Sequence, residues 1–289
     1  MSAAEKHGKP ALKVDIQKCV NSKKTLLSIN VFDYISFRAL ALSFAGTSRS
    51  VIAQFSARIF RQYDPGEIVA WRDALRFHHL WLHLDHCNDV SLLQRCARAG
   101  FDAVMFDGSH LPLKENIRAS RSALHAVKRV APRTLVECEI GHVHGVEDGF
   151  GQQKKHQNNL PLEDVLKFYT QVRPDLLAVG FGNMHGYYKG NETFDLKLMR
   201  AVGQALPHVP LVLHGGSGMA LPLVRKLIQW GHCKLNISTD LKQFWMDMLN
   251  RLPSERPKLD SPIAITQHLQ TQLERFFAQL QKKYDSCLL

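Results

Sequence analysis

Short apolar segments recur along the chain, and stretches with helical periodicity separate them. Runs of this kind, rich in Val, Ile, Leu and Phe, are typical of β-strands that are buried on both faces. Eight of them occur, at residues 25–32, 50–56, 80–86, 101–107, 134–139, 175–181, 210–214 and 233–237. The pattern therefore predicts eight strands with helices between them.

The stretches between these segments carry the start and stop signals of helices. A helix is expected at residues 65–78, which begin with Pro, and another at residues 89–99, which end before Gly100, a typical stop signal. Residues 161–172 place Glu163 and Asp164 in a first turn, where the helix dipole favours anions. A further helix is expected at residues 222–230.

Strands and helices that alternate in this way predict a parallel sheet, because parallel strands need crossover connections. Eight such units in about 240 residues match the α/β fold called the (β/α)8 or TIM barrel. We expect a single domain over residues 1–289, with the barrel core at about 25–250 and a C-terminal helical extension at 251–289. In this extension, residues 263–284 have the pattern of an amphipathic helix suited to self-association. An open doubly wound sheet would also alternate strands and helices, but no GxGxxG motif opens its first helix.

Composition narrows the class of protein. The chain is 45% hydrophobic and 22% charged, which is ordinary for a globular protein and excludes a disordered or fibrous one. No apolar run is long enough to span a membrane, and residues 1–10 lack the apolar centre of a signal peptide. We therefore expect a cytoplasmic protein without a membrane partner. The six cysteines form no CxxC pair, which indicates reduced thiols.

The net charge of +11 favours anionic ligands, which include nucleic acids and phosphorylated metabolites. The basic residues are scattered along the sequence, and none of the motifs of nucleic-acid-binding proteins is present. We therefore expect an ordinary solvated basic surface and no nucleic-acid partner.

Polar residues gather where the predicted strands end. In a parallel barrel these ends share one face, where the active sites of barrel enzymes lie. Six successive strands finish in, or run into, such residues: Asp85 and His86, Asp107, Glu137 and Glu139, the segment 182–186 with His185, His214, and Asn236. The repetition predicts that these side chains converge on one site.

Three of these residues are histidines. His86, His185 and His214 can supply imidazole ligands to one divalent metal ion, and three protein ligands with an open position are typical of catalytic zinc. His142 and His144 are rival ligands, in the polar and Gly-rich segment 141–160, whose length indicates a functional loop. His83, two residues before Asp85, is interpreted as a histidine of the barrel interior.

Carboxylates of the same set can orient metal ligands or move protons. They are Asp85, Asp107, Glu139 and Glu147, the last of them in the long loop.

Glycines follow the seventh strand in the run His214–Gly215–Gly216–Ser217–Gly218, ahead of a predicted helix. Backbone N–H groups at such a turn can approach an anion closely, and barrel enzymes often bind phosphate after strands seven and eight. Residues 236–239 close the eighth strand with amide and hydroxyl groups at the same corner, so we expect a phosphate pocket there.

Several local motifs are specific enough to compare with a family. LHLDH, GFDAVMFDGSHLPLKENI, VECEIGHVHGVEDG, LAVGFGNMHGYYKG, PLVLHGGSGM and KLNISTDLK follow one another in this order. Together they closely resemble the class II, zinc-dependent ketose-bisphosphate aldolases, over residues 25–249. The branch that acts on fructose 1,6-bisphosphate or tagatose 1,6-bisphosphate is the most similar.

The resemblance implies a lyase that reversibly cleaves a ketose 1,6-bisphosphate to dihydroxyacetone phosphate and glyceraldehyde 3-phosphate. It implies one catalytic Zn²⁺ ion per subunit, and it allows a monovalent cation as well. The phosphorylated sugar is the expected substrate. A homo-oligomer, either a dimer or a tetramer, is expected, and a non-identical stabilising subunit is compatible with the tagatose-type members.

The same resemblance assigns a role to each site residue. His86, His185 and His214 match the zinc ligands, and Asp107 and Glu139 match carboxylates that can hold an alternative zinc position. Asp85 matches the acid/base at the aldehyde oxygen, and Glu147 matches the acid/base at the C–H proton of dihydroxyacetone phosphate. The phosphate pocket corresponds to Gly186, Gly215, Gly216, Ser217, Asn236, Ile237, Ser238 and Thr239, and the other end of the substrate to Asn30 and Ser56.

The sequence departs from the family pattern in the long loop. His144 stands where the family usually has a second glycine, which leaves open an aldolase for another phosphorylated ketose. A metal-dependent hydrolase and a non-catalytic assembly subunit are further hypotheses, although the H-x-H pair expected of such a hydrolase is missing at residues 28–30. A Schiff-base mechanism has only Lys189 and Lys234 as nearby candidates, and Lys234 lies within a strand.

Overall fold

The structure is a computed structural model of the 289-residue chain, and it describes residues 11–141, 143, 160–188, 194–255 and 261–289. Its centre is a closed barrel of eight parallel strands in sequence order, as the apolar segments predict. The strands are β1 (Leu26–Asn30), β2 (Val51–Ser56), β3 (Leu80–Cys87), β4 (Ala103–Phe106), β5 (Leu135–Ile140), β6 (Leu176–Val179), β7 (Leu211–Leu213) and β8 (His232–Ile237).

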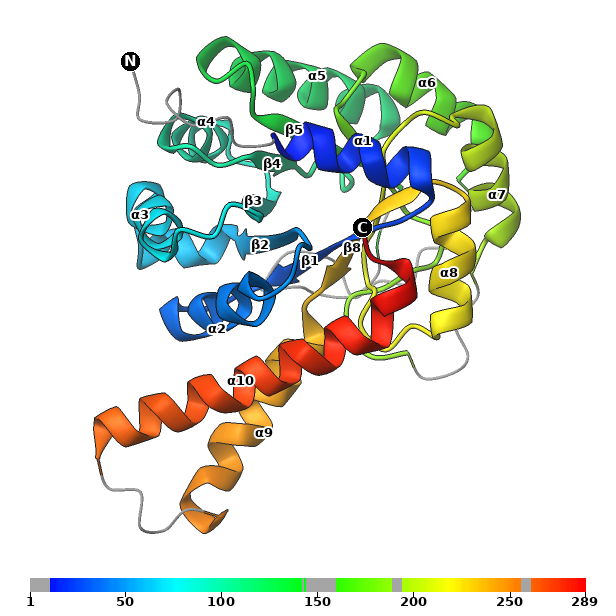
Figure 1. Cartoon of the computed structure of the whole chain (residues 1–289). Coiled ribbons are helices and arrows are strands. Elements are labelled where there is room, and N and C mark those ends of the chain that lie inside the picture. Colours follow the sequence, from blue (N-terminus) through cyan, green and yellow to red (C-terminus); the bar gives the residue numbers. More distant parts are fainter. Residues whose placement is uncertain (1–10, 142, 144–159, 189–193, 256–260) are drawn as a thin grey trace.

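Helices surround this barrel (Figure 1). Seven of them connect successive strands: α2 (Tyr34–Ala45), α3 (Pro65–Leu75), α4 (Val90–Ala99), α5 (Leu113–Val130), α6 (Leu162–Val172), α7 (Leu196–Ala205) and α8 (Leu221–Gln229). A short 3-10 helix, η2 (Ala57–Arg61), follows β2. The structure therefore confirms the (β/α)8 barrel fold.

Local capping agrees with the sequence signals. Asp64 caps α3 in a capping box with Glu67 and is followed by Pro65 at the first helical position. Gly100, the expected stop of α4, has a φ of 112°, in the left-handed region that favours glycine. Because these caps satisfy end groups of α3 and α4, both helices begin and end within a few residues of their expected positions.

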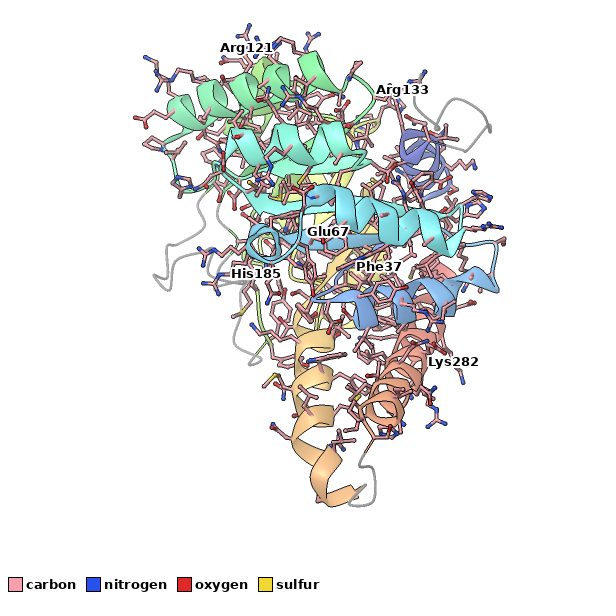
Figure 2. The ribbon with its side chains drawn as sticks, turned by 90° about the vertical axis from the view of Figure 1, so that its left-hand side faces the viewer. Phe37, Glu67, Arg121, Arg133, His185 and Lys282 are labelled. Atoms are coloured by element: carbon pink, nitrogen blue, oxygen red, sulfur yellow. The ribbon has the colours of Figure 1, made fainter. Side chains whose placement is uncertain are left out.

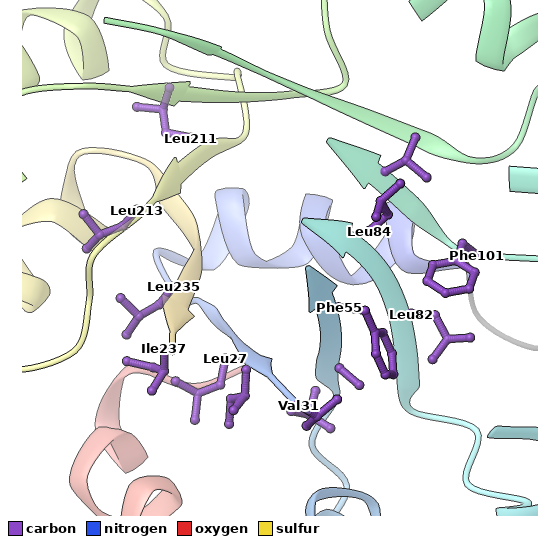
Figure 3. Packing of buried hydrophobic residues seen from close by; sticks show 14 of the residues in the cluster. Leu27, Val31, Phe55, Leu82, Leu84, Phe101, Leu211, Leu213, Leu235 and Ile237 are labelled. Carbon is purple, nitrogen blue, oxygen red and sulfur yellow. The ribbon is translucent and has the colours of Figure 1, made fainter. Parts of the chain in front are cut away.

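The core lies between the strands and the surrounding helices. Figure 3 shows side chains such as Leu82, Phe101 and Leu235 packed on the outside of the barrel wall. A second apolar cluster fills the inside of the barrel at the amino ends of the strands, where α1 (Leu12–Ser22) covers it with Leu12, Ile16, Cys19 and Val20. The term "floor" denotes this end of the barrel, and "mouth" denotes the carboxyl ends of the strands.

After β8 the chain forms two helices that extend beyond the ring (Figure 1). They are α9 (Thr239–Glu255) and α10 (Pro262–Tyr284), and the short 3-10 helix η3 (Asp285–Cys287) follows them. The helix α10 packs on α2 through buried residues that include Leu273 and Phe277. At the C-terminus, Leu288 bridges to Thr25 beside β1, so α10 returns the chain to the barrel. Among the helices of the described ranges, none is long and apolar enough to cross a membrane.

Candidate metal centre

Three histidines meet at the mouth of the barrel. His86 lies near the end of β3, His185 follows β6, and His214 is the residue after β7. Each offers one ligand atom, and these atoms all lie within 4.8 Å of one another. Figure 2 shows His185 at the end of the barrel away from the blue helix α1. The sequence prediction that these three imidazoles converge is therefore confirmed.

The ring of His86 is fixed by its backbone and by a carboxylate. His86 has a φ of 41°, an uncommon value for a residue with a side chain, where β3 and β4 shift their register. Its Nδ1 atom lies 2.8 Å from Asp107 Oδ2. Its Nε2 atom lies 3.0 Å from His214 Nδ1. The carboxylate thus occupies one ring nitrogen and directs the other toward the centre of the three histidines.

A carboxylate also holds the ring of His214, but it contacts Nε2 and not Nδ1. Its Nε2 atom lies 2.8 Å from Glu137 Oε1, and this leaves Nδ1 directed at the centre. Its backbone carbonyl accepts a hydrogen bond of 3.0 Å from the Asn183 amide. Asn236 Nδ2 lies 3.4 Å from His214 Nδ1. Such outer partners set the tautomer and the orientation of metal-ligating histidines.

Burial and neighbouring charges shift the pKa values of the carboxyl groups at the mouth. Burial opposes ionisation of Asp107, but the neighbouring His86 imidazole lowers the pKa of this carboxyl well below its usual range. Burial likewise opposes ionisation of Glu137, and the Lys234 ammonium together with the hydrogen bond to His214 lowers its pKa. Burial and the nearby Asp107 carboxylate raise the pKa of Glu139. The carboxylates of Asp107 and Glu137 therefore place negative charge next to His86 and His214.

The donor set fits a divalent metal ion. Three imidazole nitrogens with a free position suit zinc and other first-row metals. Glu139 Oε2 is buried and has no hydrogen-bond partner among the described residues, which suits a carboxylate near a cation. Burial opposes protonation of His86, whereas the Asp85 and Asp107 carboxylates raise its pKa, so positive charge is favoured here. A metal ion would supply that charge.

Asp85 lies on β3 next to the metal centre, and its side-chain hydrogen bonds to described residues all involve one oxygen. Its Oδ2 atom accepts hydrogen bonds of 3.1 Å from Asn30 Nδ2 and from Gln54 Nε2. Its Oδ1 atom is buried without a hydrogen-bond partner in the described part of the chain. Asn30, expected near the far end of the substrate, therefore positions Asp85. Ser56 ends β2 and pairs in register with Asp85.

The glycine-rich corner after β7 is held tightly against β8. The Gly216 N–H donates to Asn236 O at 3.0 Å, and a Cβ atom at Gly216 would lie only 2.7 Å from that oxygen. Ser217 Oγ accepts hydrogen bonds of 3.2 Å from the Ser238 N–H and 3.1 Å from the Asp240 N–H. Gly215 and Gly186 adopt positive φ values of 68° and 115°. The turns expected to form the phosphate pocket therefore lie together beside the metal centre, where Ile237 ends β8 and Thr239 begins α9.

Four residues singled out in the sequence belong to the long loop or to the segment after Tyr188. Glu147, His142, His144 and Lys189 lie outside the residues that the structure describes. His83 is fully buried inside the barrel, as expected, and lies 3.5 Å from Lys234 Nζ.

Sequence reasoning assigns no supporting role to four residues of the site: Glu137 and Asn183 are expected only to lie at the mouth, Lys234 is considered only for a Schiff base, and Gln54 is not singled out. Glu137 precedes Glu139 by two positions, so both face the barrel interior by the period of a strand. Gln54 precedes Ser56 in the same way on β2. The roles of Asn183 and Lys234 depend on contacts with His214 and Glu137, which are far from them in sequence.

Comparisons with known proteins identify the family of this chain. Residues 12–287 match the family described as fructose-bisphosphate aldolase class-II, and the chain belongs to this family. The 6-phospho-5-dehydro-2-deoxy-D-gluconate aldolase of Shouchella clausii is 35% identical over 186 residues, which cover 64% of this chain and 61% of that protein. The fructose-bisphosphate aldolase of Mycoplasma genitalium is 37% identical over 180 residues, which cover 62% of this chain and 60% of that protein.

The matches to these curated relatives span about three fifths of their length. Among solved structures, a provisionally described fructose-1,6-biphosphate aldolase from Coccidioides immitis superposes with a TM-score of 0.85. It is 21% identical to this chain, and 97% of each chain is covered, so it supports the fold.

Proposed function

We propose that the protein is a zinc-dependent aldolase that cleaves a phosphorylated ketose reversibly to dihydroxyacetone phosphate and an aldehyde. The observation that carries the proposal is the convergence of three imidazole nitrogens within 4.8 Å, next to a buried Asp85 oxygen that lacks a hydrogen-bond partner among the described residues. Metal ligands and a proton-transfer group at one mouth are what aldol chemistry requires. A monovalent cation at this site and a homo-oligomeric state stay predictions from the family resemblance.

Each site residue has its own role in the proposed reaction. His86, His185 and His214 hold the ion, which when bound supplies Lewis-acid stabilisation of the negative charge on the dihydroxyacetone phosphate fragment. In cleavage, Asp85 Oδ1 accepts the proton of the hydroxyl group that becomes the aldehyde, and in condensation it returns that proton. Asn30 and Gln54 hold the other oxygen of Asp85, so that Oδ1 stays directed into the site.

The resemblance to class II aldolases assigns the residues for the remaining steps. Glu147 exchanges the C–H proton of dihydroxyacetone phosphate, and the turns at residues 215–218 and 236–239 bind its phosphate group. Backbone N–H groups of glycine-rich turns suit a phosphate because they lie close to its oxygens without a side chain between them. The net charge of +11 favours the approach of such anionic substrates.

Two substrate classes follow from the relatives. Fructose or tagatose 1,6-bisphosphate yields glyceraldehyde 3-phosphate as the aldehyde. A 6-phospho-5-dehydro-2-deoxy-D-gluconate substrate, suggested by the name of the Shouchella clausii relative, yields malonate semialdehyde instead. Both reactions release dihydroxyacetone phosphate, the fragment whose phosphate group is expected at the glycine-rich corner of the site.

The experiment that tests this function is cleavage of all three substrates with dihydroxyacetone phosphate measured by a coupled assay. We expect activity with at least one of them, and its specificity constant identifies the substrate class. Removal of the metal by a chelator is expected to abolish the activity, and Zn²⁺ is expected to restore it. Full activity in protein with verified absence of metal would contradict the proposal, as would a covalent adduct trapped by borohydride.

A further inference from the structure

We propose that Lys234 is a positioning residue for the metal ligand His214 and that it acts through Glu137. This inference rests on the proposed metal centre. Lys234 Nζ lies 2.9 Å from Glu137 Oε2, and Glu137 Oε1 lies 2.8 Å from His214 Nε2. The three side chains therefore form a chain of contacts that ends on the ring whose Nδ1 faces the other histidines.

The contacts cross the inside of the barrel. Glu137 lies on β5 and Lys234 on β8, and these strands are not neighbours in the closed sheet. Lys234 is 1% exposed and Glu137 is 0% exposed, so neither side chain reaches solvent. Below them, at the floor, the interior is filled by apolar side chains such as Leu135 and Val212. The ion pair thus forms a polar layer directly beneath the metal centre.

The two oxygens of Glu137 are used on opposite sides, and this fixes the imidazole. When Oε1 accepts a hydrogen bond from His214 Nε2–H, the lone pair of His214 must lie on Nδ1, which is the atom directed at the centre. A buried carboxylate without a cation is strongly disfavoured. Lys234 is the cation in contact with Glu137, so it keeps this acceptor in place.

Asp107, the carboxylate partner of His86, is held by Ser109 and not by a lysine. Asp107 contacts His86 Nδ1 through Oδ2, and its Oδ1 atom accepts hydrogen bonds from the Ser109 N–H and hydroxyl at 3.0 and 2.7 Å. No lysine or arginine pairs with Asp107 in the described ranges. The Lys234–Glu137 pair therefore serves one of the two buried histidine ligands selectively, and its effect is expected on His214.

A double-mutant cycle tests the proposal, with the zinc dissociation constant and the tautomer of His214 as readouts. The variants are Lys234→Met, Glu137→Gln and the double variant in the full chain. Zinc affinity is measured by chelator competition, and the tautomer by ¹⁵N NMR of the metal-free protein. Each single variant is expected to weaken zinc binding by about 10- to 100-fold. The double variant is expected to bind zinc about as weakly as Glu137→Gln, because Lys234 acts only through the carboxylate.

The outcomes separate a positioning role from a structural one. Unchanged zinc affinity and an unchanged tautomer in Lys234→Met, or effects that add in the double variant, would overturn the proposal. If Lys234→Met does not fold, Glu137→Gln and the double variant decide between the outcomes, since neither of them holds an unpaired buried carboxylate at this position. A role in stability alone would change the unfolding midpoint and leave both readouts as in the wild type.

A matched control and the wild type complete the experiment. Lys128→Met removes a lysine that pairs with Asp175 at 2.6 Å outside the barrel interior, and it is expected to leave zinc affinity unchanged. If the wild type does not bind zinc, the proposed metal centre fails. The tautomer in the metal-free protein then still tests whether Lys234 positions His214, so the two failures can be distinguished.

Discussion

At the mouth of the barrel the interior holds three histidines and several carboxylates, whereas at the floor it holds apolar side chains sealed by α1. Buried oxygens at the mouth, such as Asp85 Oδ1 and Glu139 Oε2, lack a hydrogen-bond partner within the described ranges. At the floor, both oxygens of Asp15 on α1 have partners: Oδ2 accepts hydrogen bonds from Ser50 Oγ at 2.6 Å and from Trp81 Nε1 at 3.2 Å, and Oδ1 accepts one from Lys18 Nζ at 3.4 Å.

The same eight strands thus carry residues for the reaction at the mouth and residues that stabilise the fold at the floor. Asp85 and Glu139 at the mouth each leave one buried oxygen without a hydrogen-bond partner among the described residues, which costs stability but allows reaction with a ligand. The polar group at the floor is used to fix a helix on the barrel. Substitutions at the mouth should therefore change activity more than unfolding, and those at the floor should do the reverse.

The largest effect is expected at the mouth, for Asp85→Ala. Loss of the proton-transfer group should lower kcat for cleavage by about 1000-fold, or about 4 kcal/mol of transition-state stabilisation. Zinc affinity should stay near that of the wild type, because Asp85 is not one of the three clustered ligands. Steady-state kinetics and metal analysis check this expectation.

Asp73→Ala is the matched control for that substitution, because the Asp73 side chain is exposed on α3 and pairs with Arg72 at the surface. It should keep wild-type kinetics, since exposed ion pairs contribute little. A cleavage rate for Asp85→Ala within tenfold of the wild type would remove Asp85 from the proposed mechanism.

A smaller effect is expected at the amino end of β8, where His232 is buried. Burial lowers the pKa of His232 to about 4, and its Nδ1–H donates to Leu227 O at 2.8 Å. In the unfolded chain the pKa of a histidine is about 6.5, so between these pH values the unfolded state binds a proton that the native state does not. The stability due to neutral His232 is therefore present above about pH 6.5 and is lost toward pH 4, by about 3 kcal/mol in total.

Urea unfolding at several pH values tests this expectation. His232→Leu should flatten the decline of the unfolding free energy between pH 6.5 and 4 relative to the wild type. The same substitution at His208, whose side chain is exposed, should leave the decline as in the wild type. Parallel curves for the wild type and His232→Leu would contradict the assignment.

The smallest of these effects is expected for Asp15→Ala at the floor. The substitution leaves the Trp81 N–H and the Ser50 hydroxyl without this acceptor and should lower the free energy of unfolding by about 2 kcal/mol. Activity per folded molecule should stay unchanged, because the floor does not contact the site. A large loss of kcat with unchanged stability would show that the two ends are not separate.

The alternation of apolar segments with helical stretches determined that this chain forms eight strands and that its polar residues share one end of them. The apolar residues of each segment favour a buried strand, and the helix between two segments makes the successive strands parallel. The motifs around His86, His185 and His214 identified the metal centre for the same reason, since each ligand stands at a strand end.

Only the tertiary structure decided which side chains support these ligands. Glu137 and Lys234 belong to β5 and β8, and Asn30 and Asp85 to β1 and β3, so no spacing along the chain predicts their contacts. The closure of the barrel turns the side chains of these strands toward a common interior, and that closure depends on the packing of the whole sheet.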